Sequence, residues 1–230
     1  MSASPRLAVL GAGHVGPVIA RLALAAGWSV AIANSGDPAQ LELITELVIP
    51  GATPRWAADA VRDADIVVLA IPLHRFLRLD PRLVSGRLVI DAMNYWPSSD
   101  GVLEALERDG VGSSEFVAQR LPDATVVKTL NHVGYHDLEE HARPPHSPER
   151  RALGVAGDDG AAVDAVAAVI DRLGYDPVVV GGLTQGRVLQ PGGPVFGVVL
   201  SRAEFERAIR VRATGVHPPA AGETPQERSA

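Results

Sequence analysis

The stretch RLAVLGAGHVGPVIARLALAAGWSVAIANSGDP, residues 6–38, decides the fold that we expect for this chain. It reads as a short apolar strand, a glycine-rich turn, an alanine-rich helix and a second strand. Gly11, Gly13 and Gly16 have the G-x-G-x-x-G spacing of a turn that follows a strand and opens a helix. The first glycine permits the tight turn, the second lets the backbone approach a pyrophosphate, and the third lets the helix pack close to the strand. Since a helix N-terminus also attracts anions, the stretch predicts a dinucleotide-binding βαβ unit.

Two polar residues, Asn34 and Ser35, end the second strand about 20 residues beyond the turn, where an NAD-binding protein usually has an acid for the ribose 2′-hydroxyl. A carboxylate would repel a 2′-phosphate, whereas an amide and a hydroxyl can donate hydrogen bonds to it. This ending therefore favours NADP and leaves NAD open, with Arg55 and Arg75 as candidates for a basic partner. In the alternative interpretation, NSGDP is an ordinary turn in which Pro38 starts a helix.

The rest of the chain alternates β-branched runs with alanine-rich stretches, which predicts a Rossmann-type α/β fold with a doubly wound parallel sheet. The strands are near-continuous apolar runs, as expected for strands that are covered on both faces. They are predicted over 6–10, 29–33, 65–70, 87–92, 125–130, 152–156 and 176–180, with a short strand near 53–56. Helices are predicted over 15–26, 38–47, 57–62, 113–121, 161–173 and 194–210. The front half of the last helix is apolar all round, which suits burial between lobes or in a dimer interface.

Length and composition suit a dinucleotide-binding domain over residues 1–150 and a small C-terminal lobe over 151–212 that completes the cleft. Residues 139–151 are expected to form a surface loop, and the polar segment 213–230 is expected to be a disordered tail. With 47% hydrophobic and 21% charged residues, the chain can form a sizeable core.

The composition also excludes several classes of function. The net charge is −6 and the arginines are interleaved with acids, which argues against binding to nucleic acid. The absence of cysteine excludes disulfides, thiolate metal sites and a cysteine nucleophile. No apolar run reaches the roughly 18 residues of a membrane span, and the N-terminus has no signal-peptide pattern. We therefore expect a cytoplasmic protein without a membrane partner.

The candidate site residues follow the predicted strands, because ligands of open α/β sheets lie outside the carboxyl ends of the strands. Ala70, Ile71 and Pro72 would form an apolar edge against the cofactor. Asn94, Asn131 and His132 are the polar residues best placed to face a nicotinamide or its redox partner.

Three other basic residues have less specific interpretations. His14 lies in the glycine turn and can act through its backbone alone, and His74 is expected at the surface. Lys128 is the only lysine, and we expect it to reach an edge of the sheet or to pair with an acid. The sequence has no nucleophile elbow and no metal-binding motif, which is compatible with hydride transfer between two flat cofactors, since that reaction needs mainly alignment and a dry pocket.

Several stretches, read in order from about residue 6 to about residue 200, resemble the coenzyme F420-dependent NADP oxidoreductase family. They include the opening stretch, DADIVVLAIP, VIDAMN, VVKTLNHVG, VAGDDGAAV, IDRLGYDPVVVGGL and RVLQPGGPVFG. The glycine motif is common to all Rossmann enzymes, whereas AGDD and LQPGGP with LGYDPV between them are more specific. The family's usual basic residue after the serine is replaced here by Gly36.

The resemblance implies a homodimer that transfers a hydride between NADPH and the deazaflavin F420. By position, Ser35 would bind the 2′-phosphate. His132 is the catalytic candidate because of its place after a predicted strand and not because of the resemblance. The diphosphate would be held by Ala12, Gly13, His14 and Val15, the ribose and nicotinamide by Ile71, Pro72 and Asn94, and the second cofactor by Asn131, His132 and Val133.

Two other functions remain open from the sequence. The first is an NAD(P)H-dependent reductase of a small imine or carbonyl compound, with His132 or Tyr135 as the proton donor. The second is a non-catalytic module that senses a dinucleotide.

Overall fold

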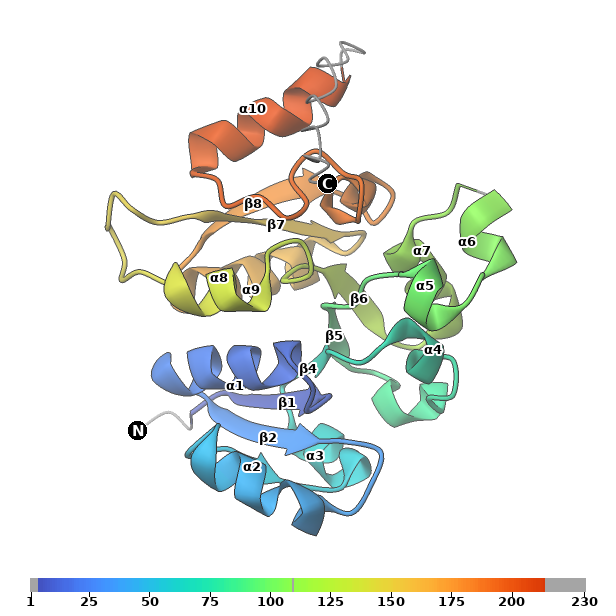
Figure 1. Ribbon diagram of the computed structural model, residues 1–230, viewed down its shortest axis with the longest axis vertical. Helices are drawn as coiled ribbons and strands as arrows, with labels where there is room; N and C mark the ends of the chain where they lie inside the picture. The colour runs from blue at the N-terminus through green and yellow to red at the C-terminus, as the bar shows by residue number, and fades with distance from the viewer. Residues whose placement is uncertain (1–3, 109, 214–230) are drawn as a thin grey trace, which may run out of the picture.

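Eight strands form one continuous sheet in the computed structural model, which describes residues 4–108 and 110–213 (Figure 1). The strand order is β3-β2-β1-β4-β5-β6-β7-β8. The strands are β1 (Arg6–Leu10), β2 (Ser29–Ala33), β3 (Thr53–Pro54), β4 (Ile66–Leu69), β5 (Leu88–Asp91), β6 (Thr125–Lys128), β7 (Ala152–Gly157) and β8 (Asp176–Gly181). Each predicted strand is present, and the doubly wound α/β fold is confirmed.

One junction in the sheet differs from the expected all-parallel arrangement. Neighbouring strands are parallel from β3 to β6 and again between β7 and β8, but β6 and β7 are antiparallel and pair over only two residue pairs. A strand buried on both faces is an apolar run that reads the same in either direction, so its sequence does not reveal such a reversal.

Helices cover both faces of the sheet. The helices of the fold are α1 (Val15–Ala25), α2 (Glu42–Leu47), α3 (Ala57–Asp63), α4 (Leu73–Phe76), α5 (Pro97–Asp100), α6 (Glu104–Arg108), α7 (Ser113–Arg120), α8 (Tyr135–Glu140), α9 (Gly160–Arg172) and α10 (Arg202–Ala213). Short 3₁₀ segments occur at η1 (Pro38–Leu41), η2 (Pro81–Val84) and η3 (Gln185–Leu189).

The core follows the alternation of side chains along each strand. In β1, Leu7 and Val9 belong to the cluster that includes residues of α1, α8 and α9, whereas Ala8 and Leu10 belong to the cluster that includes residues of α3, α4 and α7. A third cluster lies between β7, β8, η3 and α10. Because both faces are covered, the carboxyl edge of the sheet is the place where loops can form a ligand site.

The predicted helix over 194–210 is wrong in its first half. The chain passes through turns from residue 190 to residue 201, and α10 begins only at Arg202. Gly192 and Gly197 have φ angles of +81° and +72°, which a right-handed helix does not accommodate. Of the apolar residues that suggested a helix, Val195 is fully buried in the third cluster and Leu200 packs against that cluster, whereas Val198 is exposed.

The loop that was predicted over 139–151 begins only at residue 141 in the structure, because α8 continues to Glu140.

Of the predicted tail over 213–230, Ala213 is the last residue of α10 and the remainder lies outside the described residues. The division into a domain over 1–150 and a lobe over 151–212 stays a prediction. Within the described ranges, no helix combines the length and the apolarity of a membrane span.

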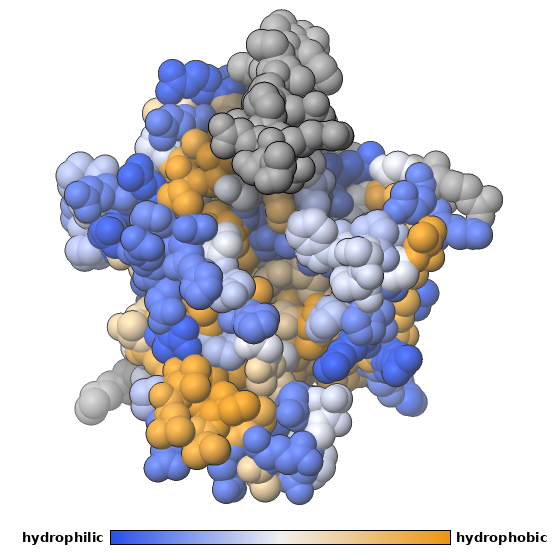
Figure 2. Space-filling view, in the orientation of Figure 1, coloured by the Kyte–Doolittle hydropathy of each residue, from blue (hydrophilic) through white to orange (hydrophobic). Residues whose placement is uncertain are grey.

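One apolar face is exposed on the outside of the molecule. Figure 2 shows apolar side chains gathered over α2, where Leu43 and Leu47 are 65% and 70% exposed and the adjacent Val48 is 45% exposed.

Candidate functional site

The three glycines of the turn after β1 have different surroundings. A Cβ on Gly11 would lie 2.2 Å from the Ala70 carbonyl oxygen, and one on Gly16 would lie 1.8 Å from the Gly11 oxygen. A Cβ on Gly13 would meet no described atom within 4 Å. Packing therefore requires Gly11 and Gly16, whereas Gly13 leaves open space beside its backbone. That open space is what a pyrophosphate needs in order to approach the chain.

The first turn of α1 is available to an anion. His14 precedes the helix without a side-chain hydrogen bond to it, and the first turn contains no acidic residue. The free N–H groups and the positive end of the helix dipole therefore lie beside the open position at Gly13.

A cavity of about 680 Å³ lies at the carboxyl ends of β1, β2 and β4, a volume within the usual range of small-molecule sites. It brings together eight of the predicted site residues, namely Gly11, Ala12, Gly13, Asn34, Ser35, Ala70, Ile71 and Pro72. The other lining residues are Leu10, Ala33, Ala57, Arg75, Arg78 and Leu79. Its lining thus contains two arginines and no acid, which gives the cavity a positive charge.

The end of β2 offers free hydrogen-bond donors to this cavity. The Asn34 side-chain oxygen accepts a hydrogen bond from the Gly36 N–H at 2.8 Å. Among the described residues, neither the Asn34 amide nitrogen nor the Ser35 hydroxyl has a hydrogen-bond partner. The nearby Asp37 carboxylate accepts a hydrogen bond from the Ala39 N–H and caps η1.

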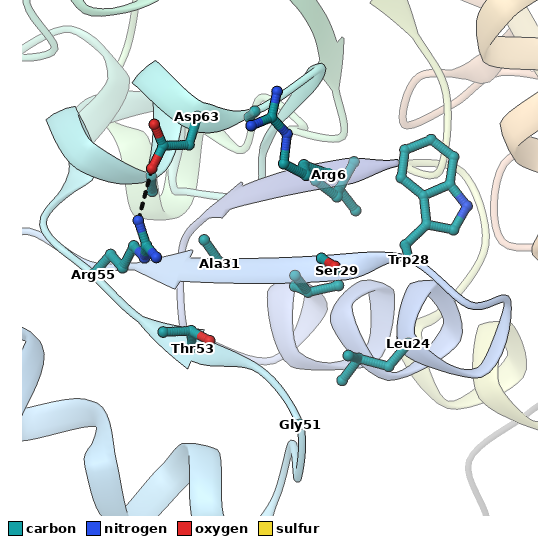
Figure 3. A pocket seen from close by; sticks show the side chains of 13 residues that line it. Arg6, Leu24, Trp28, Ser29, Ala31, Gly51, Thr53, Arg55 and Asp63 are labelled. Atoms are coloured by element: carbon teal, nitrogen blue, oxygen red, sulfur yellow. Dashed lines mark hydrogen bonds and ion pairs between the residues drawn. The ribbon is translucent and has the colours of Figure 1, made fainter. Parts of the chain in front are cut away.

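The two arginines that the sequence offered as basic partners lie in different places. Arg55 pairs with Asp63 at 2.8 Å on the wall of a second cavity of about 430 Å³ (Figure 3). That cavity lies over β1 and β2, away from the glycine turn, and is lined by Arg6, Trp28 and Thr53 among others. Arg75 lines the cavity at the glycine turn, together with Arg78.

Asn94 and Asn131 bind each other across the ends of β5 and β6. The Asn94 amide donates to the Asn131 carbonyl oxygen at 2.7 Å, and the Asn131 amide donates to the Asn94 side-chain oxygen at 2.9 Å. The Asn131 amide also donates to the Leu189 carbonyl oxygen at 2.6 Å. The first residue of the LQPGGP motif therefore helps to hold the loop after β6 in place. This contact gives the motif a structural role.

A buried polar cluster that the sequence reveals only in part lies beneath this pair. Lys128 is fully buried, with its Nζ 3.8 Å from the Asp91 carboxylate and 3.3 Å from both the Met93 carbonyl oxygen and the Ser113 hydroxyl. Asp91 also accepts hydrogen bonds from the Met93 N–H and the Ser114 hydroxyl. Burial lowers the pKa of Lys128, and the Asp91 charge opposes this change. The expectation that Lys128 pairs with an acid is confirmed.

His132 lies inside the fold, with only 1% of its surface exposed. Its Nε2 accepts a hydrogen bond from the Gly154 N–H at 3.2 Å, and its ring packs edge-on against Phe205. Burial, with the added positive charge of Lys128, lowers its pKa to about 3. The imidazole is therefore neutral near pH 7 and packs between β7 and α10.

His14 has a side-chain contact that its place in the turn did not reveal. Its exposed ring stacks on Tyr135 of α8, with the ring centroids 5.2 Å apart. His14, Val15, Gly16, Asn94, Asn131 and Val133 do not line the cavity described above. His74 pairs with Asp100 at 2.9 Å and also lies outside the cavity lining. Within the described ranges, no group of His, Asp or Glu side chains is arranged to hold a metal ion.

Comparisons with known proteins agree with the fold. The family model described as NADP oxidoreductase, coenzyme F420-dependent, matches residues 6–95. A hypothetical protein from Sinorhizobium meliloti is 29% identical with a TM-score of 0.72, and the match covers 86% of this chain and 96% of that one. A protein from Arthrobacter sp. FB24, named as a candidate F420-dependent NADP reductase, is 26% identical with a TM-score of 0.68 and coverages of 85% and 99%.

More distant structures share the fold. An imine reductase from Myxococcus stipitatus in complex with NADP+ is 20% identical with a TM-score of 0.53, over 92% of this chain and 62% of that one. A search of curated proteins gave no significant match. The match over residues 6–95 and the similar folds show that the chain is an NAD(P)-dependent oxidoreductase that resembles the coenzyme F420-dependent NADP oxidoreductase family.

Proposed function

We propose that this protein transfers a hydride between NADP(H) and a flat deazaflavin acceptor of the F420 type. The observation that carries the proposal is the cavity at the carboxyl edge of the sheet, which is open at Gly13 and has arginines but no acid in its lining. Such a cavity suits a dinucleotide that carries an additional phosphate. The name of the similar Arthrobacter protein supports the same pair of cofactors.

Each part of the dinucleotide has a matching part of the chain. The backbone from Gly11 to Val15 would hold the diphosphate at the N-terminus of α1. Asn34 and Ser35 would donate to the ribose phosphate, and Ile71 and Pro72 of the cavity lining would border the ribose and nicotinamide, together with Asn94, which lies outside that lining. The nicotinamide supplies the hydride chemistry, while the chain aligns the two reactants and excludes water.

An aromatic pair beside Asn94 supports a flat acceptor. Trp96, which is 45% exposed, contacts Phe196 edge-to-face with the ring centroids 5.7 Å apart. Phe196 directly precedes Gly197, whose N–H donates to the His132 carbonyl oxygen at 2.7 Å. The loops that follow β5 and β6 and the end of the LQPGGP segment thus meet at an exposed aromatic surface, on which a conjugated ring can stack.

The test is to mix the purified protein with NADPH and F420 and to follow the deazaflavin absorbance. We expect NADPH-dependent bleaching of F420, and we expect Trp96→Ala to slow it while the affinity for NADP+ stays unchanged. Trp56→Ala is the matched control, since Trp56 is also exposed but lies beside η1 and α3. A protein that binds NADPH and leaves F420 unchanged across the pH range would overturn the choice of acceptor.

The second candidate is reduction of a small imine or carbonyl compound, and Tyr135 favours it. The Tyr135 ring is half-buried against His14 of the glycine turn, and its hydroxyl has no hydrogen-bond partner among the described residues. A phenol at this place can donate a proton to a reduced substrate. If this candidate is correct, Tyr135→Phe lowers turnover much more than cofactor affinity, whereas hydride transfer to F420 is hardly affected.

A cytoplasmic homodimer, which the sequence led us to expect, remains part of the proposal. A dimer would give a partner to an exposed apolar face such as that of α2. Sedimentation equilibrium of the full chain tests the oligomeric state. Because the chain is an oxidoreductase, the non-catalytic sensing module is set aside.

A further inference from the structure

We propose that Arg75 and Arg78 bind the 2′-phosphate of NADP(H) and thereby determine the preference of this chain for NADP over NAD. The inference rests on the proposed dinucleotide site and assigns its phosphate specificity to a segment that follows β4. In this chain the positive charge for the 2′-phosphate would come from the segment after β4 and not from the residue that follows Ser35 at the end of β2.

The turn after β2 cannot supply the positive charge. The residue after Ser35 is Gly36, whose N–H is bound by the Asn34 side chain. A Cβ at Gly36 would lie 2.9 Å from the Gln40 side-chain oxygen, so a larger side chain would have to displace Gln40. The next residue is Asp37, whose carboxylate caps η1 and borders a separate hollow on the outer side of that turn. The end of β2 thus offers neutral donors only.

The segment after β4 supplies two guanidinium groups to the same cavity. The Arg78 N–H donates to the Arg75 carbonyl oxygen at 3.0 Å, so the two residues are one helical turn apart. Leu73 and Phe76 are buried and anchor this turn to the sheet. As a result, Arg75 and Arg78 both border the cavity that Asn34 and Ser35 also line, and β1 lies between the strands β2 and β4 that these residues follow.

The two arginines are also free to bind a ligand. Among the described residues, neither side chain has an ion pair or a hydrogen bond. Two other exposed arginines are neutralised, since Arg55 pairs with Asp63 and Arg82 pairs with Asp80. Two unpaired guanidinium groups in a cavity without an acid favour a dianion, and their planar donor groups match the oxygens of a phosphate.

The experiment measures the dissociation constants of NADP+ and NAD+ by titration calorimetry for the full chain and four variants. These variants are Arg75→Gln, Arg78→Gln, the double variant and Arg82→Gln. We expect each single site variant to weaken NADP+ binding about tenfold and the double variant about 100-fold, as for charged hydrogen bonds. The affinity for NAD+ should stay within about twofold, because NAD+ lacks the phosphate that the arginines contact. Arg82→Gln is the control, since this exposed arginine follows in the same segment but does not line the cavity.

Two results would overturn the inference while the dinucleotide site stands. An equal loss of NAD+ and NADP+ affinity would place the arginines on the adenine or diphosphate, which both nucleotides contain. Unchanged NADP+ affinity in the double variant would show that Arg75 and Arg78 do not contact the bound nucleotide. If the wild-type chain binds neither nucleotide, the proposed function itself fails, and the inference with it.

The dependence on ionic strength is a second readout. Salt screens exposed charges, so wild-type affinity for NADP+ should fall with added salt more steeply than the affinity of the double variant. Parallel salt dependences in the two proteins would contradict the proposal.

Discussion

The glycines of the turn after β1 illustrate how one motif contains different physical requirements. At Gly11 and Gly16 a side chain would collide with backbone, whereas at Gly13 it would enter the space that a ligand needs. Substitution of Gly11 or Gly16 should therefore lower the stability of the fold, whereas substitution of Gly13 should weaken nucleotide binding.

We expect Gly13→Ala to fold with an unchanged melting temperature and to bind both NADP+ and NAD+ at least about tenfold more weakly, a loss of about 1.4 kcal/mol. The added methyl group would occupy the approach of the pyrophosphate. Gly16→Ala is the matched comparison, and because its Cβ would lie 1.8 Å from the Gly11 oxygen we expect a loss of about 3 kcal/mol in unfolding free energy. Calorimetry and thermal denaturation measure the two effects. Wild-type affinity in Gly13→Ala would contradict the assignment of the pyrophosphate to this turn.

His132 should make stability depend on pH. Its pKa in the folded chain is about 3 and lies below the ordinary value of 6.5, so the unfolded chain takes up the proton first as the pH falls. The folded state therefore loses stability below pH 6.5, by about 1.36 kcal/mol per pH unit, until the folded group titrates near pH 3.

The measurement is urea unfolding of the wild type and of His132→Gln between pH 7 and pH 4. The acids of the chain titrate in both proteins, so the difference in unfolding free energy between them isolates the histidine. We expect this difference to change with the slope given above, and pH profiles that run parallel would show that His132 is not held neutral.

The residues of the cavity could be predicted because strand ends and glycine spacing are local features of a sequence. Gly13, Ser35 and Ile71 were placed together by the rule that ligands lie at the carboxyl ends of parallel strands. The choice between Arg55 and Arg75 could not be made in this way, since it depends on the pairing of Arg55 with Asp63. The burial of His132 was equally hidden, because it depends on α10, which is distant in sequence.

At the scale of elements, the Lys128 cluster joins β5, β6 and α7. It holds both the N–H and the carbonyl oxygen of Met93, directly before Asn94. The buried ion pair of Lys128 and Asp91 therefore helps to position Asn94, and with it the hydrogen bonds between Asn94 and Asn131.

We expect Lys128→Met to lower the free energy of unfolding by about 3 kcal/mol or more, because it leaves the Asp91 carboxylate buried without its cation. Adding Asp91→Asn should recover part of this loss, since the remaining buried group is then neutral. Chemical denaturation of the single and double variants provides the comparison. A Lys128→Met protein as stable as the wild type would show that the cluster contributes no net stability.

Strands were easier to predict than the segment before α10. A buried strand is an apolar run, so β1 and β2 agree with the expected bounds and the other strands differ by one or two residues. Residues 194–201 are also mostly apolar, but they follow turns that Gly192 and Gly197 permit, and only Val195 and Leu200 pack with the third cluster. Apolar content alone does not separate a helix from a turn that packs against a sheet. The short helices α4, α5 and α6 have too few residues to show a period.

At the scale of the whole molecule, the ligand cavity lies where three parallel strands end, so binding should stabilise the folded chain. At a free concentration of about 100 times the dissociation constant, a ligand adds about 2.7 kcal/mol to the free energy of unfolding. For a chain of this size that corresponds to a rise of roughly 5–10 °C in melting temperature.

We expect NADP+ to raise the melting temperature more than NAD+ does at the same concentration, because only NADP+ has a 2′-phosphate that Arg75 and Arg78 can bind. Differential scanning fluorimetry at matched concentrations measures both shifts. Equal shifts would indicate that the cavity does not distinguish the two nucleotides.

The central claim is that the glycine turn, the N-terminus of α1 and the arginine-lined wall form one site for NADP(H). Titration calorimetry of the unmodified chain with NADP+ tests it most directly. The account predicts saturable one-to-one binding that is tighter than the binding of NAD+. The absence of any association with either nucleotide at millimolar concentration would contradict it.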